Sequence, residues 1–238
     1  MTKLAIGVAA ALLCVAVGGC SDSSHPDPLL LHATTGAHLV TADRHDLRAA
    51  DFELGSGVTT IVLHSGDIGG ALYRISTPDG AGQIPSAVLS GDEVVAQLSS
   101  SGVSGPSIVN IELSSAVRWT VHLDGGASEA NVDMRAGGLT EIDFGAGVTR
   151  IDATVPEEPN TVAVRMSGGS SEFAVHGPAG VPARVTIGGG AGSATIDGVT
   201  HSGIAGGTVF VPTDWPVSGP RLDIDNTAGV STFTLDRY

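Results

Sequence analysis

The fold of this chain is constrained most by apolar residues that recur at fixed distances from small residues. Five segments can be aligned on the anchors Ser128, Gly147, Gly169, Gly192 and Gly229. Each segment has an apolar residue five positions before its anchor and another four positions after it. The residue seven positions before the anchor is also apolar, except at Thr140. Apolar residues that alternate with polar ones indicate half-buried β-strands, and the shared spacing predicts a repeat.

Glycine and alanine fill the corner between the two strands of each segment, as at residues 125–127 and 188–192. Glycine suits such corners because it tolerates positive φ and close backbone approach. A repeat of about 20 residues cannot bury its apolar side alone, so successive repeats are expected to stack about 4.8 Å apart as a β-solenoid. A β-sandwich is the alternative all-β fold, but it does not require the same register in successive segments.

The repeat also predicts how the chain is divided. Residues 119–238 carry the repeat, interrupted by an insertion at residues 198–220 that contains Pro212, Pro216 and Pro220. A further copy fits around Gly57 and residues 67–116 fit the repeat poorly, and both lie in an N-terminal region, residues 38–118. This region is predicted to form irregular β coils or a cap that shields one end of the stack.

The first twenty residues resemble a bacterial lipoprotein signal. Lys3 precedes an uncharged apolar run from Leu4 to Val17, which is too short to span a bilayer of about 30 Å. Two glycines and Cys20 follow, as in the lipobox, where signal peptidase cuts before a cysteine that then carries lipid. We expect a signal peptide at residues 1–19, lipidation at Cys20 and a flexible tether over residues 20–37. An ordinary secretory signal with an incidental cysteine is the alternative.

Charge and cysteine content exclude several classes of function. The formal net charge is −14 and Lys3 is the only lysine, which argues against nucleic-acid binding. Cys14 would leave with the signal peptide and Cys20 would be acylated, so the mature chain would have no thiol for disulfides or catalysis. The sequence predicts no cofactor.

Two aspartates are the best-placed candidates for a ligand site. Asp133 and Asp152 each stand five positions after an anchor, so the repeat predicts that they are neighbours on the outer face. Adjacent carboxylates repel one another, and a bound Ca²⁺ would relieve this repulsion. The alternative is a solvated face whose charge is balanced by Arg135 or Arg150.

Trp119 and Trp215 are interpreted as packing residues, with a sugar-binding patch as the alternative.

The segment Leu139 to Asp152, echoed around Gly169, Gly192 and Gly229, resembles the bacterial putative-adhesin β-solenoid family. That family is related to C-terminal domains of cell-wall-active-antibiotic response proteins. The resemblance covers residues 119–238 and, more weakly, residues 46–63. It implies a single-stranded right-handed β-helix outside the membrane, and it supplies no catalytic residue.

Together these features predict a non-catalytic lipoprotein on the extracytoplasmic face of the cell membrane. We expect an adhesin-like or scaffold module of the bacterial envelope, with a link to envelope stress suggested by the family resemblance. Its expected partners are the membrane, through the lipid at Cys20, and an envelope protein or polysaccharide. The alternative is a polysaccharide-acting β-helix enzyme, a lyase or glycosidase, for which Asp133, Asp152 and Arg150 are the only suitable group.

Overall fold

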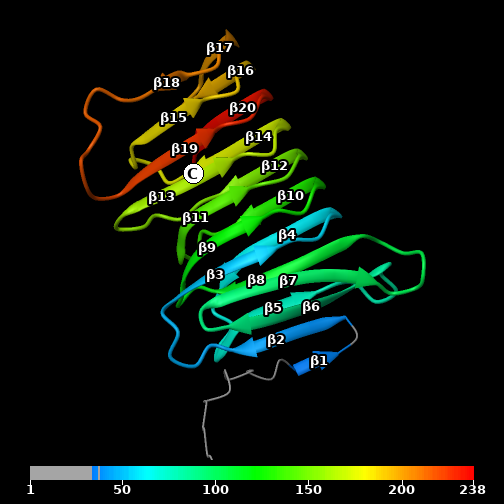
Figure 1. The fold of residues 1–238 in the computed structure, drawn as a ribbon. Helices are drawn as coiled ribbons and strands as arrows, with labels where there is room; N and C mark the ends of the chain where they lie inside the picture. The colour runs from blue at the N-terminus through cyan, green and yellow to red at the C-terminus, as the bar shows by residue number, and fades with distance from the viewer. Residues whose placement is uncertain (1–33, 37) are drawn as a thin grey trace, which may run out of the picture.

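The computed structural model describes residues 34–36 and 38–238, and these residues form two β-sheets of 11 and 9 strands (Figure 1). The prediction of an all-β fold is confirmed. No helix able to span a membrane occurs among the described residues. The predicted signal peptide, Cys20 and most of the predicted tether lie outside them.

The strands of each sheet follow one another in space from the lower end of Figure 1 to its upper end. In that order, sheet A contains β1 (Thr34–Gly36), β2 (Leu39–Asp43), β5 (Ala71–Ser76), β8 (Ile108–Ser114), β4 (Val58–Gly66), β10 (Ala127–Asp133), β12 (Val148–Thr154), β14 (Ser170–Gly177), β20 (Val230–Arg237), β16 (Ala191–Ile196) and β17 (Val199–Ile204). Sheet B contains β6 (Gln83–Ser90), β7 (Glu93–Ser100), β3 (Ala49–Leu54), β9 (Arg118–Leu123), β11 (Leu139–Phe144), β13 (Thr161–Met166), β19 (Arg221–Asn226), β15 (Ala183–Ile187) and β18 (Thr208–Phe210).

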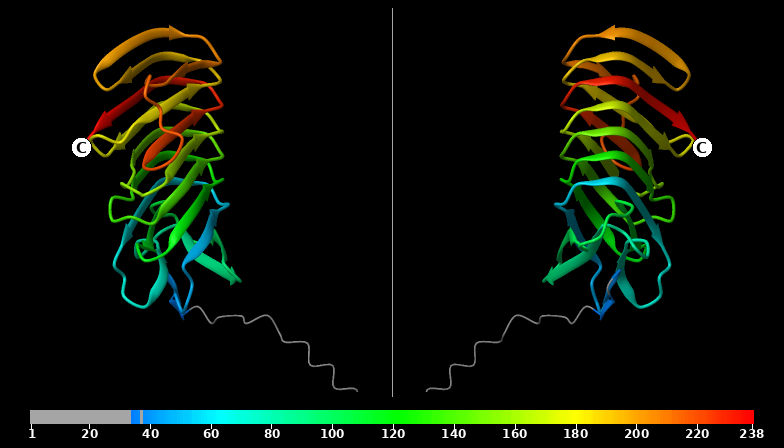
Figure 2. Two further views of the ribbon diagram at one scale, coloured as in Figure 1. Left: turned by 90° about the vertical axis from the view of Figure 1, so that its left-hand side faces the viewer. Right: turned by 90° about the vertical axis from the view of Figure 1, so that its right-hand side faces the viewer.

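The two sheets face one another across an apolar core because their strands alternate between inward and outward residues. In β9, for example, Trp119, Val121 and Leu123 are fully buried, while the residues between them are partly exposed. Phe173 of β14 packs edge to face between Phe144 and Phe233, with ring centroids 5.9 and 5.6 Å apart. The core is therefore continuous along the stack (Figure 2).

The repeating unit is a strand of sheet B followed along the chain by a strand of sheet A, and we call this unit a rung. Seven rungs pair in parallel within each sheet, in the spatial order β7–β8, β3–β4, β9–β10, β11–β12, β13–β14, β19–β20 and β15–β16. In each rung except β7–β8 a corner of three residues with at least one glycine follows the sheet-B strand, whereas the connection in β7–β8 is longer and contains Pro106. The tight corners align on one side of the molecule (Figure 2).

The rungs do not stack in chain order. Rung β3–β4 lies between β7–β8 and β9–β10, and the C-terminal rung β19–β20 lies between β13–β14 and β15–β16. The expectation that the segments around Gly169, Gly192 and Gly229 stack in that sequence is therefore wrong. The segment around Gly229 contacts both of the others.

The predicted register is wrong by two residues in two segments. Backbone hydrogen bonds align Gly126 with Gly147, and Gly190 with Gly229, so these glycines replace the anchors Ser128 and Gly192. Because side chains alternate with a period of two, a shift of two leaves each residue on its predicted face. Thr140, the exception in the apolar pattern, is exposed beside a register shift between β11 and β9.

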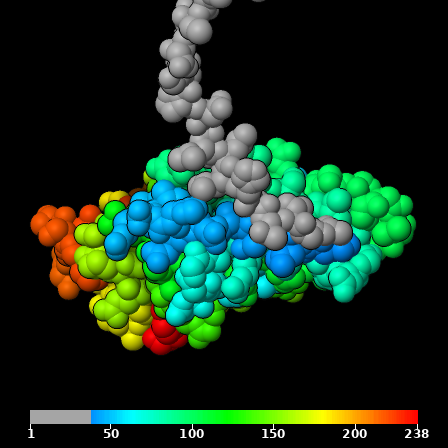
Figure 3. Space-filling view, turned by 90° about the horizontal axis from the view of Figure 1, so that it is seen from below, coloured from blue at the N-terminus to red at the C-terminus, as the bar shows by residue number. Residues whose placement is uncertain are grey.

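Antiparallel strands close both ends of the stack. At the lower end β5 pairs with β8 and β2, and β6 pairs with β7. At the upper end β17 pairs with β16, and β18 pairs with β15. Residues 38–118 thus contain two rungs as well as the lower antiparallel strands, and residues 198–220 contain β17 and β18. Seen from below, the N-terminal half covers the lower end (Figure 3).

Candidate functional site

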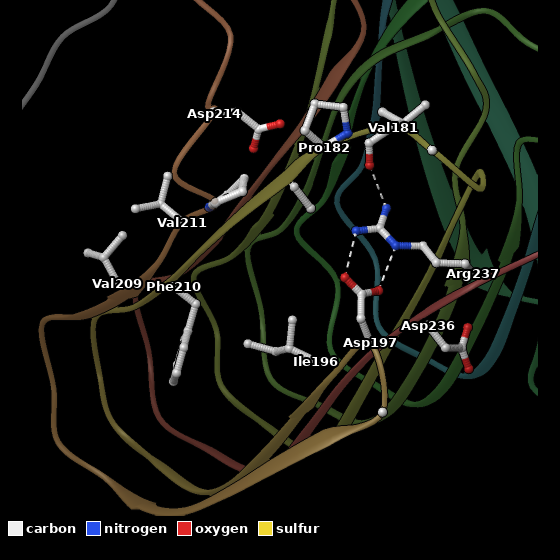
Figure 4. Close-up of a pocket in the computed structure, with 14 residues that line it drawn as sticks. Val181, Pro182, Ile196, Asp197, Val209, Phe210, Val211, Asp214, Asp236 and Arg237 are labelled. Carbon is white, nitrogen blue, oxygen red and sulfur yellow. Dashed lines mark hydrogen bonds and ion pairs between the residues drawn. The ribbon is translucent and has the colours of Figure 1, made fainter.

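A pocket of about 990 Å³ lies near the upper end, on the side opposite the tight corners. We call it the upper pocket. It is formed by the turns before β15 and after β16, by β18 with the loop that follows, and by the end of β20. Its apolar lining includes Val181, Pro182, Ile196, Val209, Phe210 and Val211, and its charged lining is Asp197, Asp214, Asp236 and Arg237 (Figure 4).

Arg237 holds one side of the upper pocket in place. Its Nε and Nη2 donate to the two carboxylate oxygens of Asp197 at 2.7 and 3.2 Å, and its Nη1 donates to the carbonyl of Val181 at 2.8 Å (Figure 4). A two-point arginine–carboxylate contact fixes both position and orientation. The guanidinium thus links the turn at Asp197 to the turn before β15, and the pocket combines an apolar wall with a fixed ion pair.

A column of polar side chains runs from Arg74 to the edge of this pocket on the outer face of sheet A. We call it the polar column. Its members are in-register neighbours on successive strands: Arg74, Glu112, His64, Asp133, Thr154, His176 and Asp236. At its lower end Arg74 and Glu112 carry opposite charges on neighbouring strands, which stabilises these strands in register.

The two histidines of the polar column each contact a carboxylate. Nε2 of His64 lies 3.1 Å from Glu112, which also pairs with Arg74 at 3.4 Å. His176 lies between Asp236, 2.5 Å from Nδ1, and Asp152, 3.3 Å from Nε2. Burial opposes a charge on His176 and is the largest single influence. Hydrogen bonds and attraction to Asp236 and Asp152 together outweigh it and raise the pKa of His176.

The predicted register that places Asp133 directly beside Asp152 is wrong. Asp152 is paired in register with Asn131, and Asp133 with Thr154, because the true corner is Gly126. Asp133 instead binds Arg135, and hydrogen bonds from Arg135 hold the pKa of Asp133 below its usual value. The two aspartates are therefore offset by two residues on adjacent strands and are not direct cross-strand neighbours, so the calcium site at this pair stays a prediction. In the part of the chain that the structure describes, no three His, Cys, Asp or Glu residues are grouped to hold a metal ion.

Asp133, Asp152 and Arg150, the group considered for a polysaccharide-acting enzyme, do not contact one another, because each contacts a different residue. Arg150 binds Glu172 with an Nε–Oε2 distance of 2.8 Å, whereas Asp133 binds Arg135 and Asp152 contacts His176. The two tryptophans differ in their surroundings. Trp119 is fully buried, and Arg184 and Arg221 lie 5.2 and 5.8 Å from the centre of the Trp215 ring. Burial confirms the interpretation of Trp119 as a packing residue, whereas Trp215 is partly exposed and its role stays a prediction.

The sequence alone does not predict that His176 contacts Asp236 or that Arg237 contacts Asp197. Their contacts depend on β20 pairing with both β14 and β16, which the assumption of stacking in chain order hides. The sequence does contain one signal, because Phe173 and Phe233 stand at the same place in their segments, whereas the segment between them has Ile196 there in the predicted register and Ala194 in the observed one. In the structure these two phenylalanines are in-register neighbours.

Comparison with known proteins gives a likeness in fold alone. No protein-family model matches the sequence. No curated protein matches it either. The solved structure of a putative cell adhesion protein from Clostridium sporogenes is similar over 84% of this chain and 98% of its own, with a TM-score of 0.62 and 17% identity. A putative adhesin from Bacteroides fragilis covers the same shares at 13% identity, but with a TM-score of 0.24 it carries no argument.

Proposed function

We propose that this chain is a non-catalytic, adhesin-like interaction module of the bacterial envelope. The observation that carries the proposal is the seven-rung stack in parallel register, which presents two long polar faces and shares its fold with the Clostridium sporogenes protein named as a putative cell adhesion protein. Repeating strands at about 4.8 Å spacing suit extended contacts with a polymer or a protein surface. We also propose that the rungs form one single-stranded right-handed β-helix of the putative-adhesin type, in spite of the altered rung order.

Several carboxylates at the surface form ion pairs with arginines. A paired carboxylate is not free to act as a general acid or base, and this favours a binding role over catalysis. Glu172 pairs with Arg150, Asp197 with Arg237, and Asp223 with Arg184. The upper pocket, with its apolar wall and fixed ion pair, is the place at which we propose that an envelope polysaccharide or protein segment binds. A role in envelope-stress sensing through a membrane partner is part of the same proposal.

We place the module on the extracytoplasmic face of the membrane, held by lipid on Cys20. The lipobox-like sequence before Cys20 supports this placement. The test is expression of the full chain and of Cys20→Ala in a bacterial host, with metabolic labelling by a palmitate analogue and fractionation of the cells. We expect the label and the membrane fraction to depend on Cys20. Equal membrane recovery of the two chains, without label, would contradict the lipid anchor.

Binding and catalysis are separated by one assay on purified envelope material. The lipid-free chain from residue 21 is incubated with peptidoglycan carrying its attached polymers, and both bound protein and released sugar are measured. We expect saturable binding that Arg237→Ala weakens and no release of sugar. Release of reducing or unsaturated sugars would establish the enzyme alternative, and absence of binding would remove this class of ligand.

A further inference from the structure

The upper end of sheet A carries a strand with one unpaired edge, β17. It is joined to β16 by a turn of two residues, Asp197 and Gly198, whose φ angles are +48° and +81°. Residues that flank such a turn form a hydrogen-bonded pair, and hydrogen-bonded pairs alternate along an antiparallel ladder. Val199 and His201 are therefore bonded to β16, while the backbone groups of Thr200 and Ser202 point to the open edge.

Nothing in the sequence of β17 blocks this edge. Its six residues, Val-Thr-His-Ser-Gly-Ile, include no Asp, Glu, Lys, Arg or Pro, although the chain as a whole carries a net charge of −14. Proteins commonly protect edge strands with charged side chains or proline. The edge strand of sheet B at the lower end follows this rule, because β6 contains Pro85. The regular part of the β17 edge, Val199 to Ser202, therefore carries neither charge nor proline, and the strand departs from extended geometry only at Gly203, whose φ is +64°.

The core of the stack is also incompletely covered beneath this edge. His201 packs against Phe210 of β18 with ring centroids 4.8 Å apart, and both side chains remain partly exposed. Val199, on the same inward-facing side, is 58% exposed. Another layer of strands above β17 would bury these side chains and satisfy the free backbone groups at the same time.

We propose that this layer is a second copy of the chain, with β17 paired antiparallel to β17 of that copy around a two-fold axis close to His201, so that Thr200 of each copy lies opposite Ser202 of the other. Two uncharged edges of the same strand are complementary to one another, and the pairing continues both the hydrogen-bond ladder and the apolar core. Contact at this end also keeps the acidic remainder of the two chains apart, which limits repulsion between like charges. A two-fold interface of this kind is closed, so it stops at two copies.

The two N-terminal ends then lie at opposite extremes of the pair, because β1 and β2 are at the end of the stack remote from β17 (Figures 1 and 2). If Cys20 is lipidated, as the proposed function holds, the pair joins copies anchored in two facing membranes. This consequence rests on the proposed function, whereas self-association through β17 does not.

Sedimentation equilibrium of the lipid-free chain from residue 21 tests the pairing without any membrane. Thr200→Lys places a charge at the edge, and Ser202→Pro removes an outward N–H where an edge strand tolerates proline. Thr149→Lys is the matched control, because Thr149 is exposed on β12 in the middle of sheet A. Circular dichroism and thermal unfolding of each variant establish that it is folded.

We expect a monomer–dimer equilibrium for the natural chain and for Thr149→Lys, and a dimer dissociation constant at least about tenfold higher for Thr200→Lys and Ser202→Pro. Beads that carry the chain by its N-terminus should cluster, and Thr200→Lys should prevent the clustering. A monomeric natural chain, or folded edge variants that associate as well as the natural chain does, would overturn the proposal. Association in solution without bead clustering would overturn the end-to-end orientation.

Discussion

At the scale of single residues, glycine is needed at the corners for two separate reasons. Gly169 and Gly190 have φ angles of +82° and +86°, which disfavour residues with a side chain. Gly168 has no such angle, but a Cβ atom there would overlap the backbone of Ala146 on the neighbouring rung. The stacking of the rungs therefore sets this requirement at Gly168, and the turn conformation does not.

We predict that Gly168→Ala destabilises the protein by about 1–3 kcal/mol, because the backbone atoms that it meets cannot move without disturbing the parallel ladder. The control is Gly66→Ala at the end of β4, where a Cβ atom would have no neighbour within 4 Å. That change should be neutral or stabilise by up to about 1 kcal/mol, since alanine restricts the unfolded chain. Denaturant unfolding measures both. Equal effects would show that close approach is not what selects glycine.

The contacts of His176 predict a dependence of stability on pH. Its pKa is raised in the folded chain, so the protonated ring is favoured by folding. The resulting stabilisation is fully present below the unfolded pKa of about 6.5, and it is lost as the pH rises through the higher folded pKa.

His176→Gln should therefore lower the free energy of unfolding more at about pH 5.5 than at about pH 8.5. The exposed residue His45, in the turn between β2 and β3, gives the control His45→Asn. The difference between this control and the natural chain should change much less with pH. The interpretation fails if His176→Gln loses the same free energy of unfolding at both pH values.

At the scale of elements, the C-terminal rung is an internal part of the stack. β19 pairs with β13 and β15, and β20 pairs with β14 and β16. Beyond these pairings, β15 and β16 contact only the antiparallel strands β18 and β17 within their sheets. The last rung of the sequence thus connects the upper end to the rest of the molecule.

Truncation should reveal this connection. A chain ending at residue 177 retains five rungs with all their mutual pairings, whereas a chain ending at residue 220 adds four strands that have lost their link to β13 and β14. We predict that both truncated chains unfold at the same temperature within about 4 °C, although one is longer by 43 residues. A clearly higher unfolding temperature for the chain ending at residue 220 would contradict the interleaved order.

The sequence predicts the in-and-out pattern of the elements well and their order poorly. Alternation within each strand depends on local chemistry, so the pattern assigns Val162, Val164 and Phe173 to the core correctly. The register slips by two residues at Ser128 and Gly192, because several small residues adjoin each corner and any of them fits the pattern. Which rung lies beside which is decided by contacts between residues far apart in the chain, and a local repeat carries little information about them.

At the scale of the whole molecule, the stack has two different ends. The lower end carries the N-terminal strands and a proline-containing edge, and the upper end carries the upper pocket and the unblocked strand β17. An anchor at one end and binding features at the other suit a module that extends from a surface. The positions of both features depend on the spatial order of the rungs, so that order is the central claim.

Cysteine cross-linking in the lipid-free chain from residue 21, which has no cysteine of its own, tests this order most directly. Three pairs are compared on the outer face of sheet A: residues 174 with 234, 234 with 195, and 174 with 195. In-register neighbours on adjacent strands lie about 4.8 Å apart and those two strands apart about 10 Å, while a disulfide needs Cα atoms within about 7 Å. We predict that oxidation joins the pairs Ala174→Cys/Thr234→Cys and Thr195→Cys/Thr234→Cys, and leaves Ala174→Cys/Thr195→Cys reduced. Efficient cross-linking of residues 174 and 195 would show that the rungs stack in chain order, and would contradict the account.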